Sequence, residues 1–198
     1  MKYYLSIDVS TTNAGFIIFI DDKLAHYSHL KLIVDKDTTK ENKEYLKAEI
    51  FKEYLKYLSV IYPRFDAVFV EAALISSSNI FTAATLQSFN AMCRFCIVQT
   101  LNVIPVAITV SLSRKLFFPE YCTVKKIKGV ETSVLSFPVE FKDRKKEFIR
   151  MKVESLEPSI NWHYTAKGTI KETSYDISDA YCIMIAGLSI LNINNNNN

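Results

Sequence analysis

Apolar and polar positions form blocks along the chain, and these blocks predict an α/β domain that opens with strands. Residues 3–9, 15–20 and 24–34 are rich in apolar, β-branched and aromatic side chains, and the polar links between them are short enough for hairpins. We therefore expect three antiparallel strands at the start. Residues 39–61 then carry an apolar stripe at helical spacing, which predicts an amphipathic helix that ends before Pro63.

The rest of the chain continues in alternating strands and helices. Residues 67–70 and 103–108 are predicted strands, and the nearly uncharged segment 79–100 between them is a predicted helix. Further helices are expected at 111–118, 142–156 and 176–191. Segment 119–141 interrupts this pattern and is predicted to be an inserted hairpin or a long loop. The order of elements indicates a mixed five-stranded sheet, three antiparallel strands first and then parallel strands, flanked by helices.

The length of 198 residues suits one domain, which we place at residues 1–192 with the insertion at about 119–141. Residues 193–198 are asparagine-rich and expected to be disordered. No signal-like segment opens the chain, and the apolar run at 180–191 is shorter than the roughly 20 residues of a membrane helix. Cys93 and Cys96 lie in an apolar helix pattern without zinc-ligand spacing. We expect an intracellular, soluble protein without a membrane partner.

The net charge of +3 is unevenly distributed. Residues 122–152 contain nine Lys or Arg and four Asp or Glu, so this segment carries +5 and the remainder carries −2. Such a segment is either a solvated basic helix or a surface that binds phosphates. Its position relative to the acidic residues decides between the two.

Four acidic residues stand out because of the elements on which they fall. Asp8 lies inside the apolar strand YYLSIDVS and Glu71 ends the strand pattern AVFVEAA, where a buried charge is costly unless it is paired or bound to metal. Asp176 and Asp179 share one face at the start of an otherwise apolar helix. Taken alone, Asp179, or Asp176 as an N-terminal cap, is more often an acid of a helix start than a metal ligand. Taken together, the four acids predict a site for divalent cations.

Oxygen ligands select hard cations, so Mg²⁺ is the expected cofactor, with Mn²⁺ as a substitute. Two such ions about 4 Å apart activate a water and stabilise the leaving oxygen when a phosphodiester is hydrolysed. The predicted chemistry is therefore nuclease chemistry.

The segments that carry these residues resemble a known family. LSIDVSTTNAGFIIF, VFVEAAL, SNIFTAATLQSFNAMC, VIPVAITVSLSRKLF, KDRKKEFIRMKV and YDISDAYCIMIAG together, in this order, look like the RuvC family of Holliday junction resolvases, including its phage, poxvirus and mitochondrial relatives. The resemblance implies an RNase H-like fold, a homodimer, and metal-dependent paired nicks in four-way and other branched DNA. A phage or viral source would place the protein in the host cytoplasm.

The resemblance also implies roles for individual residues. Asp8 matches the aspartate of the first strand, Glu71 the glutamate, and Asp176 and Asp179 the paired acids of the last helix. Lys145 and Lys146 stand where the family places basic residues near the scissile phosphate. With the rest of the basic segment, the expected DNA contacts are Lys125, Lys126, Lys142, Arg144, Lys145 and Lys146. The insertion and a loop after Glu71 without a basic residue depart from the bacterial pattern.

Other functions remain open on the sequence alone. A ribonuclease H acting on RNA/DNA hybrids would use the same acids. The I-D-x-S-T-T motif also resembles the phosphate loop of actin-like ATPases, but those need two such domains, so no nucleotide cofactor is expected. A DNA-binding scaffold would have no need of four acids. Phe81 is expected in the core rather than as an aromatic wedge for DNA.

Overall fold

The computed structural model describes residues 1–73, 80–127 and 130–196 of the chain. The first half holds β1 (Tyr3–Val9), β2 (Asn13–Ile20), β3 (Lys23–Lys31), α1 (Lys40–Ile61), β4 (Ala67–Glu71) and α2 (Ile80–Leu101). The second half holds β5 (Val106–Ile108), α3 (Val110–Phe117), η1 (Pro119–Tyr121), β6 (Cys122–Ile127), β7 (Val130–Leu135), η2 (Val139–Phe141), α4 (Lys145–Leu156) and α5 (Glu172–Asn196).

The main sheet has five strands in the order β3-β2-β1-β4-β5. β1 pairs antiparallel with β2, and β2 pairs antiparallel with β3, whereas β4 is parallel to both β1 and β5. This is the mixed sheet that the sequence predicted. Because β1 and β4 are parallel neighbours, their carboxyl-terminal ends meet at the same edge of the sheet.

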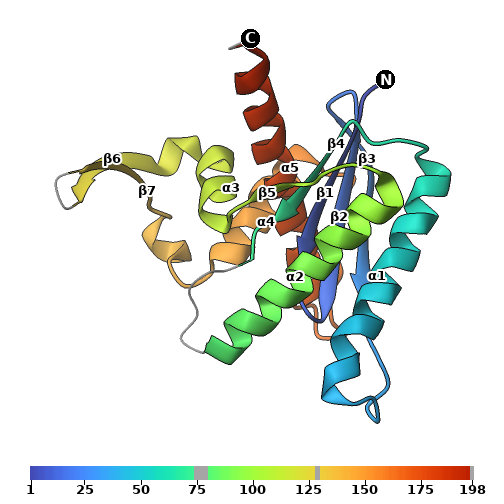
Figure 1. The fold of residues 1–198 in the computed structure, drawn as a ribbon. Helices are drawn as coiled ribbons and strands as arrows, with labels where there is room; N and C mark the ends of the chain where they lie inside the picture. The colour runs from blue at the N-terminus through green and yellow to red at the C-terminus, as the bar shows by residue number, and fades with distance from the viewer. Residues whose placement is uncertain (74–79, 128–129, 197–198) are drawn as a thin grey trace.

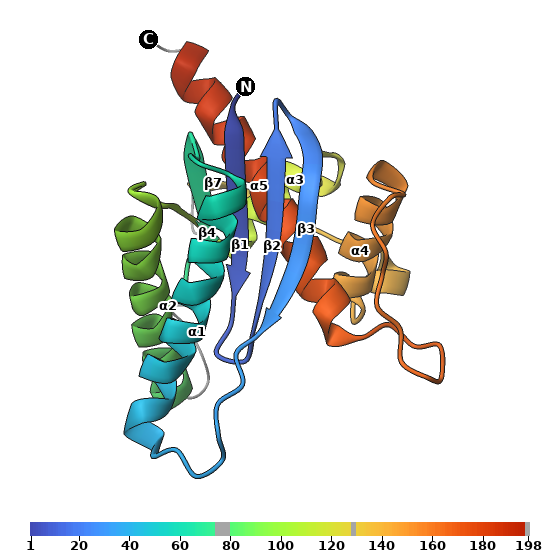
Figure 2. The same cartoon turned by 90° about the vertical axis from the view of Figure 1, so that its right-hand side faces the viewer.

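Helices cover both faces of the sheet (Figures 1 and 2). α1 and α2 pack on one face, where Leu5 and Ile7 of β1 join their core. α5 crosses the other face, where Tyr4 of β1 and Phe69 of β4 join its core, with α3 and α4 packed beside it. Successive side chains of a strand point to opposite faces, so β1 contributes to both cores.

The two long apolar helices differ from expectation at their ends. α2 was expected to bury Phe81, but this side chain is 80% exposed, because the first turn of α2 extends past the sheet (Figure 1). α5 begins at Glu172, four residues before the predicted start, and continues to Asn196 through part of the tail expected to be disordered. α5 is therefore longer than predicted at both ends, whereas α2 keeps the predicted length and is shifted by one residue.

Within the described residues, α5 is also the single helix that is long and apolar enough over Glu172–Ile193 to cross a membrane, judged by length and composition. More than half of that window is buried, and α5 packs against all five strands of the main sheet. A central core helix has these same properties.

Segment 119–141 forms a hairpin of its own. β6 and β7 pair antiparallel in a separate two-stranded sheet, which projects from the body of the molecule (Figure 1). Of the two predicted forms, a hairpin or a long loop, the hairpin is confirmed. α4 starts at Lys145 rather than at residue 142, because the 3₁₀ turn η2 ends immediately before Lys142.

Candidate active site

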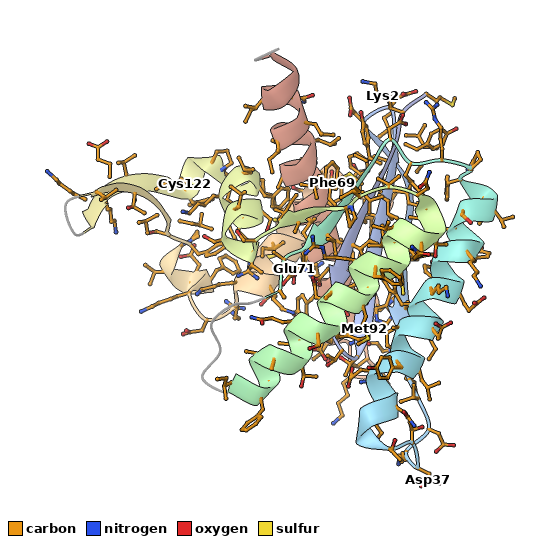
Figure 3. All side chains as sticks on the ribbon, viewed as in Figure 1. Lys2, Asp37, Phe69, Glu71, Met92 and Cys122 are labelled. Atoms are coloured by element: carbon orange, nitrogen blue, oxygen red, sulfur yellow. The ribbon has the colours of Figure 1, made fainter. Side chains whose placement is uncertain are left out.

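The four acids predicted from the sequence line one open hollow of about 500 Å³. Asp8 comes from the end of β1 and Glu71 from the end of β4, next to it in the sheet. Asp176 and Asp179 come from α5, which crosses this face. Figure 3 labels Glu71 where β4 ends, near the centre of the molecule. Residues more than 160 positions apart in sequence therefore face the same volume.

A row of three residues across the sheet positions α5 over this hollow. Asp8 of β1 lies opposite Gly15 of β2, and Gly15 lies opposite His29 of β3. Cross-strand neighbours point to the same face, so Asp8 and His29 flank the place where Gly15 has no side chain. The backbone of Asp176 occupies that place, and a Cβ at Gly15 would collide with its carbonyl oxygen. Gly15 thus allows α5 to approach the sheet closely enough for its acids to reach Asp8.

The carboxyl groups of Asp8 and Glu71 are neighbours in the hollow and interact with each other. Burial raises the pKa of Asp8 well above its ordinary value, and the carboxylates of Glu71, Asp179 and Asp176 raise it further. The Asn90 amide of α2 donates a 2.8 Å hydrogen bond to the backbone carbonyl of Glu71, which fixes the end of β4. Neighbouring carboxylates repel each other unless a proton or a cation offsets their charge.

Asp176 is buried and is not a helix cap. Because α5 starts at Glu172, Asp176 lies in the second turn and is only 6% exposed. Its Oδ2 atom lies 3.5 Å from His29 Nε2, at the outer limit of a hydrogen bond. The two atoms do not form a well-aligned hydrogen bond, and neither has another hydrogen-bond partner within the described residues. A buried carboxylate oxygen without a partner is costly, which favours a ligand role over a capping role.

Asp179 is the acid closest to positive charge. Lys146 Nζ of α4 lies 3.6 Å from its carboxylate, and Arg114 of α3 lies 3.9 Å away. Burial raises the pKa of Asp179 to about 6, although these two cations oppose the shift. Burial lowers the pKa of Lys146, but the attraction of Asp179, Asp8 and Asp176 outweighs it, so the net shift is upward.

The six predicted DNA-contacting residues fall in two places. Lys142, Arg144, Lys145 and Lys146 line a hollow of about 680 Å³ along the start of α4, which Arg114 also lines. Arg114 and Lys146 line the acidic hollow as well, so the two hollows are adjacent. Lys125 and Lys126 instead lie on the projecting hairpin, exposed to solvent, and outside the set of residues that line either hollow.

Sequence reasoning missed three residues of this site. Arg114, Gly15 and His29 were not predicted, and only Gly15 carried a signal, as a glycine inside a strand pattern that marks a close backbone approach. Arg114 follows the last strand of the sheet in an ordinary amphipathic helix, and His29 lies in an edge strand. Their roles depend on contacts with α5, a distant segment.

Comparison with known proteins identifies the fold. No family model and no curated protein matches the sequence. Among solved structures, Thermus thermophilus RuvC in complex with a Holliday junction substrate aligns with a TM-score of 0.61, over 98% of this chain and 96% of that one, at 11% identity. Another T. thermophilus RuvC structure aligns with a TM-score of 0.56, over 97% and 96% of the two chains, also at 11% identity. The fold is RNase H-like. At this identity the similarity establishes the fold alone.

The acid cluster of this RNase H-like domain suits a hard cation in its donor chemistry. Asp8, Glu71, Asp176 and Asp179 offer only oxygen atoms, and the Asp176 Oδ2 atom has no hydrogen-bond partner within the described residues. Within that same part of the chain, no group of three or more His, Cys, Asp or Glu side chains is already close enough to hold a metal ion. A cation held jointly by these acids would require their side chains to move closer together, which mutual repulsion of the carboxylates opposes when no cation is bound.

The raised carboxyl pKa values predict that the metal-free protein loses stability as pH rises. A group with a pKa raised to about 6 in the folded state, as for Asp179, favours folding below its unfolded pKa of about 4 and loses this contribution as pH passes 6. In EDTA, we expect the melting temperature to be higher at pH 5 than at pH 8 by at least about 2–4 °C. Differential scanning fluorimetry measures this.

Two controls test whether the acid cluster, rather than other titrating groups, causes this pH dependence of stability. Adding Mg²⁺ at pH 8 should restore the lost stability, because a bound cation replaces the missing protons. Asp179→Asn should flatten the pH dependence in EDTA. A melting temperature that rises from pH 5 to pH 8 in EDTA, in the wild type, contradicts the prediction.

Proposed function

We propose that this protein is a Mg²⁺-dependent endodeoxyribonuclease that cuts four-way and other branched DNA junctions, acting as a homodimer that makes paired nicks. The observation that carries the proposal is the convergence of four acids from β1, β4 and α5 in one open hollow, with two cations at its rim. A structural charge cluster would need no open volume beside it.

In the proposed reaction, each group of the site has a role that follows from its position. Asp8, Glu71, Asp176 and Asp179 would hold the Mg²⁺ ions. When bound, these ions supply a Lewis acid for the charge that develops on the phosphate oxygens. Lys146 and Arg114, which lie at the rim beside Asp179, are placed to neutralise the incoming phosphate. Cations bound there would offset the repulsion between Asp8 and the neighbouring carboxylates.

DNA rather than another phosphodiester is supported by the basic surface next to the acids. Along the start of α4, beyond the acidic hollow, five Lys or Arg side chains outnumber the two acids Asp143 and Glu147 in the lining of the adjacent hollow. A surface of this kind attracts a polyanion that continues past the cleavage position. Junction specificity is supported by the shared fold with RuvC, one of whose structures contains a Holliday junction substrate.

The homodimer is supported by apolar surface on the helices opposite α5. Tyr45 of α1 and Phe95 of α2 are mostly exposed, and they border a largely apolar hollow of about 450 Å³ between these helices. Exposed apolar surface of this kind marks an interface, and a two-fold dimer fits symmetric nicking of a two-fold junction. Analytical ultracentrifugation of the wild type tests the dimer directly.

A substrate panel tests the proposed activity. With Mg²⁺, the purified protein is expected to cut a labelled four-way junction at least about tenfold faster than linear duplex of the same sequence, because only the junction offers the branched geometry. An RNA/DNA hybrid of equal length belongs in the panel. Equal rates on all three substrates would refute junction selectivity, and cleavage of the hybrid alone would indicate a ribonuclease H.

A further inference from the structure

A third hollow, of about 560 Å³, lies where the inserted hairpin joins the domain, and we call it the hairpin-base hollow. Its positive side chains are Arg114, Lys142 and Lys145. The end of β7 and the start of η2 form the opposite side, through Leu135, Ser136, Phe137 and Val139, and α3 adds Val110 and Ser111. Among these described lining residues there is no Asp or Glu.

The positive charges of the hairpin-base hollow are poorly neutralised by the protein. Lys142 and Lys145 make no ion pair with any carboxylate in the part of the chain that the structure describes, and the Arg114 guanidinium reaches Asp179 only at 3.9 Å. Three cations around one volume repel each other unless an anion enters it. The two serines that line the hollow add hydroxyl groups that donate hydrogen bonds to an anion.

The wall of this hollow is held rigidly by aromatic packing. Phe137, at the end of the hairpin, packs edge-on against Phe118 at 5.6 Å and against Phe148 of α4 at 5.8 Å. Phe118 and Phe148 are themselves stacked at 5.2 Å. The base of the hairpin is therefore anchored to α4, and the hollow is preformed, which lowers the entropic cost of binding.

The position of the hollow indicates what the anion is. Arg114 and Val110 line both the hairpin-base hollow and the acidic hollow, and Lys142 and Lys145 line both it and the hollow along α4. The three hollows therefore adjoin one another, which offers a path along neighbouring cationic side chains. A polymer of regularly spaced phosphates follows such a path, whereas a single free anion uses one point of it.

We propose that the hairpin-base hollow binds a backbone phosphate of the DNA strand, separate from the phosphate that is cut, and that the insertion 119–141 exists to complete this second phosphate site. The inference rests on the proposed function and adds to it the role of the insertion. Arg114 links the two sites because it faces both, so a strand held in the hairpin-base hollow enters the acidic hollow in a defined register.

The test places a negative charge in the hollow without disturbing the core. Val139 lines the hollow and is 88% exposed, so the fold tolerates Val139→Glu. Val139→Gln is the matched variant, because glutamine has the size of glutamate without its charge. Val60, near the end of α1 and outside the residues that line the apolar hollow between α1 and α2, is similarly exposed at 84%, so Val60→Glu controls for the change in net charge. All are made in an Asp8→Asn background, and binding to a labelled four-way junction is followed by fluorescence anisotropy.

We expect Val139→Glu to weaken junction binding about tenfold relative to Val139→Gln. The new carboxylate repels the phosphate and pairs with the Lys and Arg side chains that would otherwise bind it. The slope of log K against log salt should also decrease by about one. Val60→Glu should bind within about twofold of the parent.

Three other results overturn the inference, and they differ in what they imply. If the parent binds the junction and Val139→Glu equals Val139→Gln, the hairpin-base hollow is not a DNA site and the proposed function stands. If inorganic phosphate binds at submillimolar concentration without DNA, and Val139→Glu abolishes this, the hollow is a site for the free anion. If the Asp8→Asn parent binds no DNA, the proposed function fails together with the inference.

Discussion

Replacing Asp8 with asparagine is expected to reduce cleavage of a four-way junction by at least about 10³-fold while junction binding is retained. Asparagine keeps the shape of the side chain but removes the charge that a divalent cation needs, at the centre of the cluster where Glu71, Asp176 and Asp179 all act on Asp8. Single-turnover cleavage measures the first effect, and fluorescence anisotropy in Mg²⁺ measures the second.

The fold should survive this change. Asp8 has a raised pKa because its charge is disfavoured by burial and by neighbouring carboxylates, so a neutral amide leaves stability unchanged or increases it. Asp37→Asn is the matched control, because Asp37 is an exposed residue in the loop before α1, far from Glu71 (Figure 3). Cleavage by Asp8→Asn within about tenfold of the control would remove Asp8 from the active site.

Replacing Gly15 with alanine is expected to cost about 3 kcal/mol of stability and at least about 10²-fold in cleavage rate. The added Cβ occupies the place of the Asp176 carbonyl, so α5 must move away from β2 and carry Asp176 and Asp179 with it. A shift of about 1 Å is enough to misplace catalytic groups. Urea denaturation measures stability, and single-turnover cleavage at a temperature where the variant is folded measures the rate.

Gly187→Ala separates loss of packing from loss of position. Gly187 lies in the same helix, and a Cβ there would collide with the Phe69 ring in the core of this face. We expect a comparable loss of stability, but a much smaller loss of cleavage, because the collision is three turns away from Asp176 along α5. If both variants lose cleavage equally under conditions where they are folded, Gly15 acts through stability alone and does not position the acids.

Much of the fold was accessible from the sequence because local patterns encode it. The apolar, β-branched and aromatic runs of the opening strands and the helical stripe before Pro63 predicted β1 to β3 and α1. The predicted limits of α4 and α5 and the predicted burial of Phe81 were wrong. These features depend on where a helix leaves the surface on which it packs.

The four acids could also be predicted as site residues from the sequence, because buried charges need a partner. Asp8 inside an apolar strand and Glu71 at a strand end are costly unless something pairs with them, so their identity was visible without coordinates. The pairing of Asp176 with Asp179 came from their spacing on one helix face, and the resemblance to the RuvC family supported it. Which metal binds, and which DNA is cut, stay predictions that the experiments above address.

What the sequence by itself determined is therefore the order of strands and helices, the acidic residues and the basic segment, since each follows from neighbours in the chain. Only the tertiary structure decided that Gly15 admits the backbone of Asp176, that Arg114 stands between the acidic hollow and the hairpin-base hollow, and that the insertion forms a wall of the latter. These relations join segments far apart in the chain. They depend on how α5, α3 and the hairpin dock against the sheet and α4, because contacts between distant segments form only when the whole domain folds.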